Sequence, residues 1–181
     1  MADKFNVFES TNMATTHYAK RILDATCDED IENGTFGYLT GTDDVKTFVK
    51  GYKAGEEIVV ADNPAWDVEM VNSPKRSGVR KDKYVNKANI PFRVRVIAEG
   101  DTFATAIEGV TTASQELMKK DAYVTIDETT GKLVAKASST TDAGFEAVVE
   151  KEQLRGGVIE TTAHNYGYST KMYVCTVKTL V

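Results

Sequence analysis

Short runs in which hydrophobic and polar residues alternate recur along most of the chain. The clearest is 92–97, where Phe92, Val94 and Val96 fall on one face of an extended strand. Similar runs, most of them bounded by Gly, Asn or Asp, predict further strands at 35–40, 45–49, 57–61, 66–71, 102–107, 123–127, 132–137, 145–150 and 172–177. About ten short strands at even spacing are typical of a compact β-sandwich or β-barrel of antiparallel strands.

The stretch 121–150 contains a well-marked hairpin. Val124 and Ile126 fall on one face of its first strand, and a turn at 128–131 leads into a second alternating run. The stretch has no histidine, no cysteine and no arrangement of a nucleophile with a base. We therefore interpret this hairpin as scaffold that holds other segments at fixed positions.

Few segments have the periodicity of a helix. Two short helices are predicted at 16–25 and 113–119, each too short to be stable alone. Residues 1–15 are polar apart from a few hydrophobic positions, among them Phe5 and Phe8. They form either a frayed terminus or an extended arm that docks its aromatic side chains on a neighbouring subunit.

The length and composition agree with one mainly β domain. The 181 residues suffice to bury a core, and 22 Thr and 20 Val supply the Cβ-branched side chains that favour pleated strands. The predicted organisation is an N-terminal arm at 1–15 followed by a single β-rich domain at 16–181. No run of about 18 apolar residues is present, so no membrane helix is expected. The first residues also lack the apolar centre of a secretory signal.

Charge is unevenly distributed along the chain, although the net charge is −5. The stretch 72–89 is predicted to be a long loop, which in a compact domain is usually functional or mobile. It carries five closely spaced cations: Lys75, Arg76, Arg80, Lys81 and Lys83. The loop is either simply solvated or contacts an acidic protein surface. Nucleic acid is disfavoured as a partner, because the net charge is negative and only Tyr84 interleaves the cations.

No catalytic, cofactor or metal site is recognisable in the sequence. His17 and His164 are far apart and lie at no metal-ligand spacing, and no phosphate-binding or nucleophile motif occurs. The acidic stretch 28–34 fails as a calcium loop, because its glycine is the seventh residue rather than the sixth. Cys27 and Cys175 could pair, but Cys175 lies in a strand-like run and is expected to be a buried free thiol. We predict that the protein is not an enzyme and needs no cofactor or metal.

Five segments together carry a resemblance to a known class of proteins. They are DIENGTFGYLTG at 30–41, AEGDTFATAIEGV at 98–110, KKDAYVTIDETTGKL at 119–133, ASSTTDAGFEAVVE at 137–150 and KMYVCTVKTLV at 171–181. In this order they resemble the strands, the Gly-Asp and Thr-Gly turns and the Ser/Thr/Asp linker of the decoration, or head-stabilising, proteins of tailed bacteriophage capsids.

The resemblance implies a structural virion protein on the outer face of an icosahedral capsid. It would be assembled in the host cytoplasm and would bridge subunits of the major capsid protein, beside neighbouring copies of itself. The candidate capsid contacts are Phe5 and Phe8 of the arm together with the five cations of the basic stretch.

Two other hypotheses remain open. One is a head-fibre, tail or surface module that recognises a host protein or glycan, because 161–169 contains the Tyr, Ser, Asn and Gly of adaptable binding loops. The other is a small β-barrel hydrolase whose carboxylates converge only in the fold.

Overall fold

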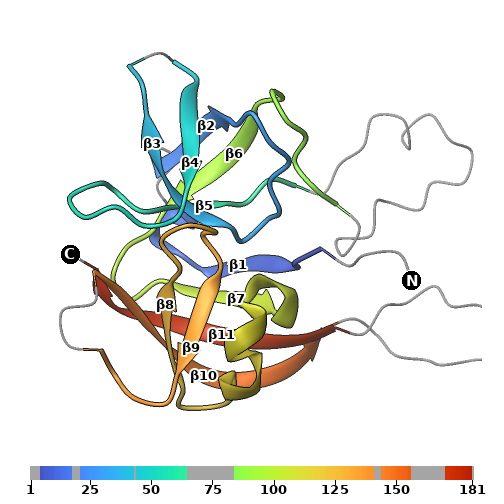
Figure 1. Cartoon of the computed structure of the whole chain (residues 1–181), viewed down its shortest axis with the longest axis vertical. Coiled ribbons are helices and arrows are strands. Elements are labelled where there is room, and N and C mark those ends of the chain that lie inside the picture. Colours follow the sequence, from blue (N-terminus) through green and yellow to red (C-terminus); the bar gives the residue numbers. More distant parts are fainter. Residues whose placement is uncertain are drawn as a thin grey trace, which may run out of the picture.

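The computed structural model is mainly β and describes residues 5–17, 21–42, 44–64, 84–140, 144–155 and 170–180. Within these residues a five-stranded closed barrel stacks against a six-stranded sheet (Figure 1). The alternation in the sequence therefore predicts the fold class correctly, with a barrel and an open sheet both present. The strand predicted at 66–71 lies outside the described residues.

The barrel forms the upper half of the molecule in Figure 1. Its strands follow the order β2 (Ile22–Thr26), β4 (Lys46–Lys50), β3 (Phe36–Thr40), β5 (Val59–Ala61) and β6 (Phe92–Val96), and β6 pairs with β2 to close the ring. β2 and β4 run parallel, whereas the other neighbouring strands are antiparallel. Apolar side chains fill the interior, where the ring centroids of Phe48 and Phe92 are 5.6 Å apart. Closure removes the open edges that would otherwise invite pairing with other chains.

Strand β6 is buried on both of its faces. Phe92, Val94 and Val96 face the barrel interior, which confirms the face predicted from their alternation. On the opposite face Arg95 is also buried and forms an ion pair with Asp62. The alternation thus identified one buried face and missed that the polar face is covered as well.

The six-stranded sheet is antiparallel throughout. Its order is β1 (Phe8–Asn12), β7 (Thr102–Ala106), β11 (Thr170–Leu180), β10 (Phe145–Arg155), β8 (Tyr123–Ile126) and β9 (Leu133–Lys136). After β7 come two 3₁₀ helices, η3 (Ile107–Gly109) and η4 (Thr112–Leu117). η4 covers the edge strand β9, because the Ala135 amide donates to the Ser114 hydroxyl at 3.0 Å.

One hydrophobic core joins the sheet to the barrel. The ring of Phe36, in barrel strand β3, lies 5.5 Å from that of Phe103 in β7 and 5.4 Å from that of Phe145 in β10. Phe8 of β1 stacks on Phe103 at 5.6 Å. All four rings are buried in the same cluster. Because this core takes side chains from both β-systems, the barrel and the sheet pack as one unit.

The helix predicted at 16–25 is wrong. The α-helix α1 spans only Ala14–His17, and 22–26 forms strand β2. Ladders with β6 on one side and β4 on the other outweigh the weak intrinsic helix stability of so short a segment. The helix predicted at 113–119 is present as the 3₁₀ helix η4. No described helix is long and apolar enough to cross a membrane.

The N-terminal arm predicted at 1–15 is also corrected by the structure. Strand β1 pairs with β7 from Phe8, opposite Thr105, to Asn12, opposite Thr102. Phe8 and Met13 are buried in the shared core. Residues 5–15 are therefore part of the fold. The pattern concealed this strand, because its register shifts between Glu9 and Asn12 and its alternation is lost.

Candidate functional site

The tip of the β8–β9 hairpin joins the sheet to the barrel. Asp127 begins the turn, and its Oδ1 accepts the amides of Thr129 and Thr130 at 3.2 and 2.7 Å and the Thr130 hydroxyl at 2.7 Å. The two hydrogen bonds from Thr130, and to a smaller extent the one from Thr129, hold the pKa of Asp127 below its ordinary value of 3.8. The turn ends at Gly131, whose carbonyl oxygen accepts the amide of Phe36 in β3 at 2.8 Å. The tip is thus a hydrogen-bonded joint between the two β-systems.

Two glycines allow this close approach. Gly131 has a φ of +68°, and a Cβ there would overlap the carbonyl oxygen of Phe36. Gly51, directly after β4, has a φ of +99°, and a Cβ there would overlap the carbonyl oxygen of Glu128. Both positions need glycine for the backbone conformation and for the space that a side chain would take.

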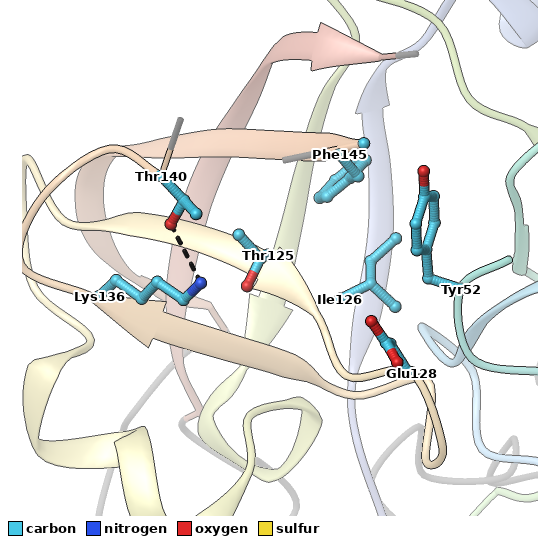
Figure 2. Close-up of a pocket in the computed structure, with 8 residues that line it drawn as sticks. Tyr52, Thr125, Ile126, Glu128, Lys136, Thr140 and Phe145 are labelled. Atoms are coloured by element: carbon cyan, nitrogen blue, oxygen red, sulfur yellow. Dashed lines mark hydrogen bonds between the residues drawn. The ribbon is translucent and has the colours of Figure 1, made fainter. Parts of the chain in front are cut away.

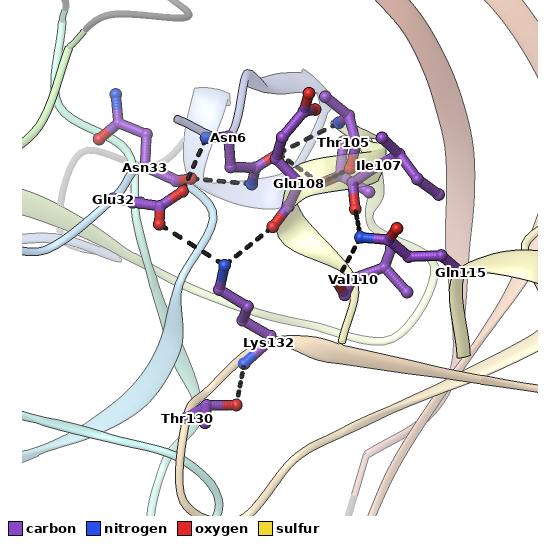
Figure 3. A network of polar contacts seen from close by, with 11 residues as sticks. Asn6, Glu32, Asn33, Thr105, Ile107, Glu108, Val110, Gln115, Thr130 and Lys132 are labelled. Atoms are coloured by element: carbon purple, nitrogen blue, oxygen red, sulfur yellow. Dashed lines mark hydrogen bonds and ion pairs between the residues drawn. The ribbon is translucent and has the colours of Figure 1, made fainter. Parts of the chain in front are cut away.

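Lys132 extends the joint with a bridging cation (Figure 3). Its Nζ donates to the carbonyl oxygen of Glu108 at 3.0 Å and lies 3.5 Å from Oε1 of Glu32. The other carboxylate oxygen of Glu32 accepts the amide of Asn6 at 2.7 Å. One lysine therefore links the hairpin to the segment after β7 and to the turn before β3.

Asn6 connects the same turn to the sheet. Its side chain is buried, and its Nδ2 donates to the carbonyl oxygen of Asn33 at 2.9 Å. Its Oδ1 accepts the Thr105 hydroxyl at 3.1 Å and the Ala106 amide at 3.2 Å. A buried amide whose donor and acceptor are both used fixes the relative position of the groups it bonds.

Further asparagines join the two described segments that flank residues 65–83. Oδ1 of Asn33 accepts the amide of Asn63 at 3.1 Å and Nδ2 of Asn86 at 3.0 Å. Nδ2 of Asn63 donates to the Tyr84 hydroxyl at 2.7 Å, and that hydroxyl donates to Oδ1 of Asn86 at 3.3 Å. Asn63 precedes and Tyr84 directly follows the part of the basic stretch that lies outside the described residues. The described residues on either side of 65–83 are therefore held side by side on the barrel.

The predicted capsid contacts meet different outcomes. The five cations lie in 65–83, outside the described residues: Lys75, Arg76, Arg80, Lys81 and Lys83. Phe5 is partly buried and precedes β1. Phe8 is corrected, because its ring packs on Phe36 and Phe103 inside its own fold and has no surface left for a partner.

A pocket of about 220 Å³ opens beyond the end of the ladder between β8 and β10 (Figure 2). These two strands pair at only two positions, and the pocket lies past them, between Ile126 and Phe145. Tyr52, from the barrel segment after β4, closes the other side. The pocket is therefore built where the barrel, the hairpin and the start of β10 meet.

Polar side chains stand at two ends of this pocket (Figure 2). At one end Nζ of Lys136 donates to the Thr140 hydroxyl at 3.0 Å, and Thr125 lies beside them. Thr125 is 9% exposed and forms no side-chain hydrogen bond with the described residues. The exposed carboxylate of Glu128 lies at the other end, near Tyr52. The pocket thus offers donors and acceptors that the described part of the fold does not fully use.

The rim of the pocket is held in place by a buried carboxylate. Oε1 of Glu146 accepts the Ser139 hydroxyl and Oε2 accepts the Thr140 amide, both at 2.8 Å. Across the pocket, a Cβ on Gly144 would overlap the hydroxyl of Tyr52. The positions of Thr140 and Tyr52 are therefore set by packing and hydrogen bonds within the fold.

An acidic group at the barrel does not favour metal binding. The potential ligand atoms of Cys27, Asp28 and Glu29 lie within 4.8 Å of one another. Burial is the main cause that raises the pKa of the Cys27 thiol, which disfavours the thiolate that a metal would bind. Glu29 is already paired with Lys50 at 2.8 Å.

Both cysteines are free and buried, which confirms the expectation for Cys175. Burial raises the pKa of the Cys175 thiol far above its ordinary value. An uncharged thiol inside a core is a packing group and is unreactive.

Sequence reasoning missed both the asparagine network and the pocket. Asn33 was recognisable only as part of an Asn-Gly turn, and its partners Asn6 and Asn86 lie far from it in the chain. Comparison of the chain with protein-family models, curated proteins and solved structures finds no match. Function must therefore be inferred from this chain alone.

Proposed function

We propose that the protein is a structural virion protein that decorates the outer face of an icosahedral phage capsid. It bridges subunits of the major capsid protein, beside neighbouring copies of itself, and is assembled in the host cytoplasm. The observation that supports this most is the hydrogen-bonded joint between barrel and sheet, made by Gly131, Lys132 and Asn6. Together with the shared core, it makes a platform whose two halves have little freedom to move relative to each other.

A capsid clamp requires this kind of platform. Internal pressure pulls neighbouring subunits apart, and a hinged protein would extend before it resisted. Each copy needs only modest affinity, because contacts with several subunits of a repeating lattice add through multivalency. Rigid spacing between contact segments keeps their effective concentration high, whereas flexible spacing dilutes it.

The basic stretch is the segment that we assign to the capsid contact. The described residues that flank 65–83, Asn63 and Tyr84, are bonded to each other, and Asn63 is also bonded to Asn33. The cations of the basic stretch complement an acidic shell surface and would orient the protein on approach. Contacts of this kind weaken as salt rises, because exposed charges are screened over about 8 Å at physiological ionic strength.

Co-sedimentation with mature, empty phage shells tests the proposal. The intact chain is expected to pellet at a saturable stoichiometry. A variant with glutamine at Lys75, Arg76, Arg80 and Lys81 is expected to lose most of this binding. The matched control places glutamine at four exposed lysines outside the stretch, Lys119, Lys120, Lys151 and Lys178, and is expected to pellet like the intact chain.

The N-terminus needs a shorter deletion than the sequence alone would indicate. Removing residues 1–15 would remove β1 and the buried Phe8, so loss of binding would report unfolding. Removing residues 2–4 leaves every described residue in place and tests the terminus itself. Failure of the intact chain to pellet with shells would overturn the decoration function and favour recognition of a host protein or glycan.

A further inference from the structure

The pocket beside the β8–β9 hairpin contains polar groups without partners in the described fold (Figure 2). Thr125 is more than nine-tenths buried as a residue, but its hydroxyl opens on the pocket and forms no hydrogen bond with the described residues. This hydroxyl is therefore available to a ligand as both donor and acceptor. We infer that this pocket binds a single sugar ring, as a site separate from the capsid contact proposed above.

The size of the pocket limits the ligand. Its volume is about 220 Å³. Pockets that bury drug-sized ligands measure roughly 300–1,000 Å³. A single ring with its substituents matches the smaller volume, and a longer chain would have to leave through the opening. The site therefore fits one sugar unit, free or at the end of a glycan.

Charge favours a ligand without net charge. The ammonium of Lys136 stands at one end and the carboxylate of Glu128 at the other (Figure 2). An anion would be attracted by Lys136 and repelled by Glu128. A cation would be repelled by Lys136 and attracted by Glu128. A ligand with hydroxyl groups around a ring can accept from Lys136, donate to Glu128 and do either with Thr125 and Thr140. Such a ligand uses every polar group of the site without net charge.

The remaining walls fit the less polar faces of a sugar ring. The apolar part of the lining consists of Tyr52, Ile126 and Phe145, and Tyr52 packs against the core cluster to which the other two belong. Flat apolar walls with a few fixed polar groups are the usual construction of small-molecule sites, in which the polar groups set orientation and specificity. Glu146 holds Thr140 in place before any ligand arrives, so little ordering is required on binding.

Saturation-transfer NMR on the full chain tests the inference. The probes are D-glucose, D-galactose, N-acetyl-D-glucosamine and L-rhamnose, with acetate and glycine as charged and zwitterionic comparators. At least one sugar is expected to bind with a Kd in the millimolar range, as suits so small a contact. Acetate and glycine are expected to bind at least tenfold more weakly.

Two threonine variants separate binding from folding. Thr125→Val keeps the shape of the side chain and removes the hydroxyl, and it is expected to weaken sugar binding about tenfold. Its thermal midpoint should not fall, because the hydroxyl has no described partner to lose. Thr47→Val, at an exposed strand position in the barrel, is expected to leave both binding and midpoint unchanged.

Several results would overturn the inference. These are no detectable binding of any of the four sugars, equal binding of acetate or glycine, and equal sugar affinities in Thr125→Val and Thr47→Val. A thermal midpoint that falls in Thr125→Val but not in Thr47→Val would assign the Thr125 hydroxyl a structural role. That result would also reject the inference. None of these results bears on shell binding, which the substitutions in the basic stretch test separately.

Discussion

Single residues decide how closely the hairpin tip can approach the barrel. Gly131 and Gly41 both have positive φ angles, +68° and +91°, so an alanine at either position adopts a disfavoured backbone conformation. Only at Gly131 would the added Cβ also overlap backbone, the carbonyl oxygen of Phe36. Gly131→Ala is therefore expected to lower the free energy of unfolding by about 3 kcal/mol, and Gly41→Ala by only about 1 kcal/mol. Urea unfolding of both variants measures the difference.

The Gly41 variant is the control for backbone conformation, because nothing lies within 4 Å of a Cβ at that position. Equal losses for the two variants would mean that the tip can move away from β3 at no cost. That result would remove the main support for a rigid joint.

The carboxylate that caps the hairpin turn should make stability depend on pH. The folded-state pKa of Asp127 is lowered, so its stabilising effect is present above the ordinary value of 3.8 and is lost as pH falls through the lower folded value. Asp127→Asn removes the charge at every pH and is expected to cost about 1 kcal/mol near neutral pH. Unfolding free energies from about pH 6 to about pH 2 should show this gap closing below the ordinary pKa of 3.8. A gap that stays constant would mean that the charge of Asp127 contributes nothing.

At the residue scale the sequence predicts the turn but not its contacts. The run 128–131 is recognisable from its turn residues and the alternation on either side. That Gly131 must also be small to meet Phe36 follows from a tertiary contact between residues 95 positions apart, which no local pattern encodes.

At the scale of elements, Asn6 attaches the segment before β1 to both β-systems. It is 2% exposed and bonds to groups near β7 and before β3. Asn6→Ala is expected to cost about 2–4 kcal/mol, because several buried partners lose their bonds at once. Asn12→Ala, at the exposed end of β1, should cost less than about 0.5 kcal/mol. Denaturant midpoints of the two variants provide the test. Similar values would contradict the conclusion that the hydrogen bonds of Asn6 hold the two β-systems together.

The sequence predicts most strands of the described fold and misses two. Strands such as β6, β8 and β11 have one continuous apolar face, and local alternation reveals them. β2 was interpreted as helix, because Ile22 and Ala25 also lie at helical spacing. β1 has a single large apolar residue and a register shift, so its identity depends on pairing with β7, a strand about 95 residues later.

At the scale of the whole molecule, the pocket shows what local patterns cannot predict. Tyr52, Thr125 and Gly144 come from three separate parts of the chain, and each is unremarkable in its own segment. Their convergence follows from how the barrel sits on the sheet, which depends on the shared core. The same applies to the surroundings of the basic stretch: its charge is evident from the sequence, but the bond between Asn63 and Tyr84, on either side of 65–83, appears only in the fold.

The shared core also predicts how the molecule unfolds. Phe36 belongs to a barrel strand but packs among sheet residues, so the barrel shares this core with the sheet in addition to its own interior cluster. A change inside the barrel should therefore destabilise the sheet equally. Phe48→Leu, at a buried barrel position, is expected to cost about 1.4 kcal/mol and to lower hydrogen-exchange protection about tenfold. The slowest amides of β6 and β11 should lose protection by the same factor.

Proteins of this size usually unfold in a single cooperative transition only when their parts share a core. Loss of protection in β6 alone would show that the barrel opens independently of the sheet. A barrel that opened in this way would break the hydrogen bonds of Asn63 with Asn33 and Tyr84, which hold the described residues on either side of 65–83. Coupled exchange in β6 and β11 would instead mean that a load on the basic stretch reaches the sheet, which is the property that a capsid clamp requires.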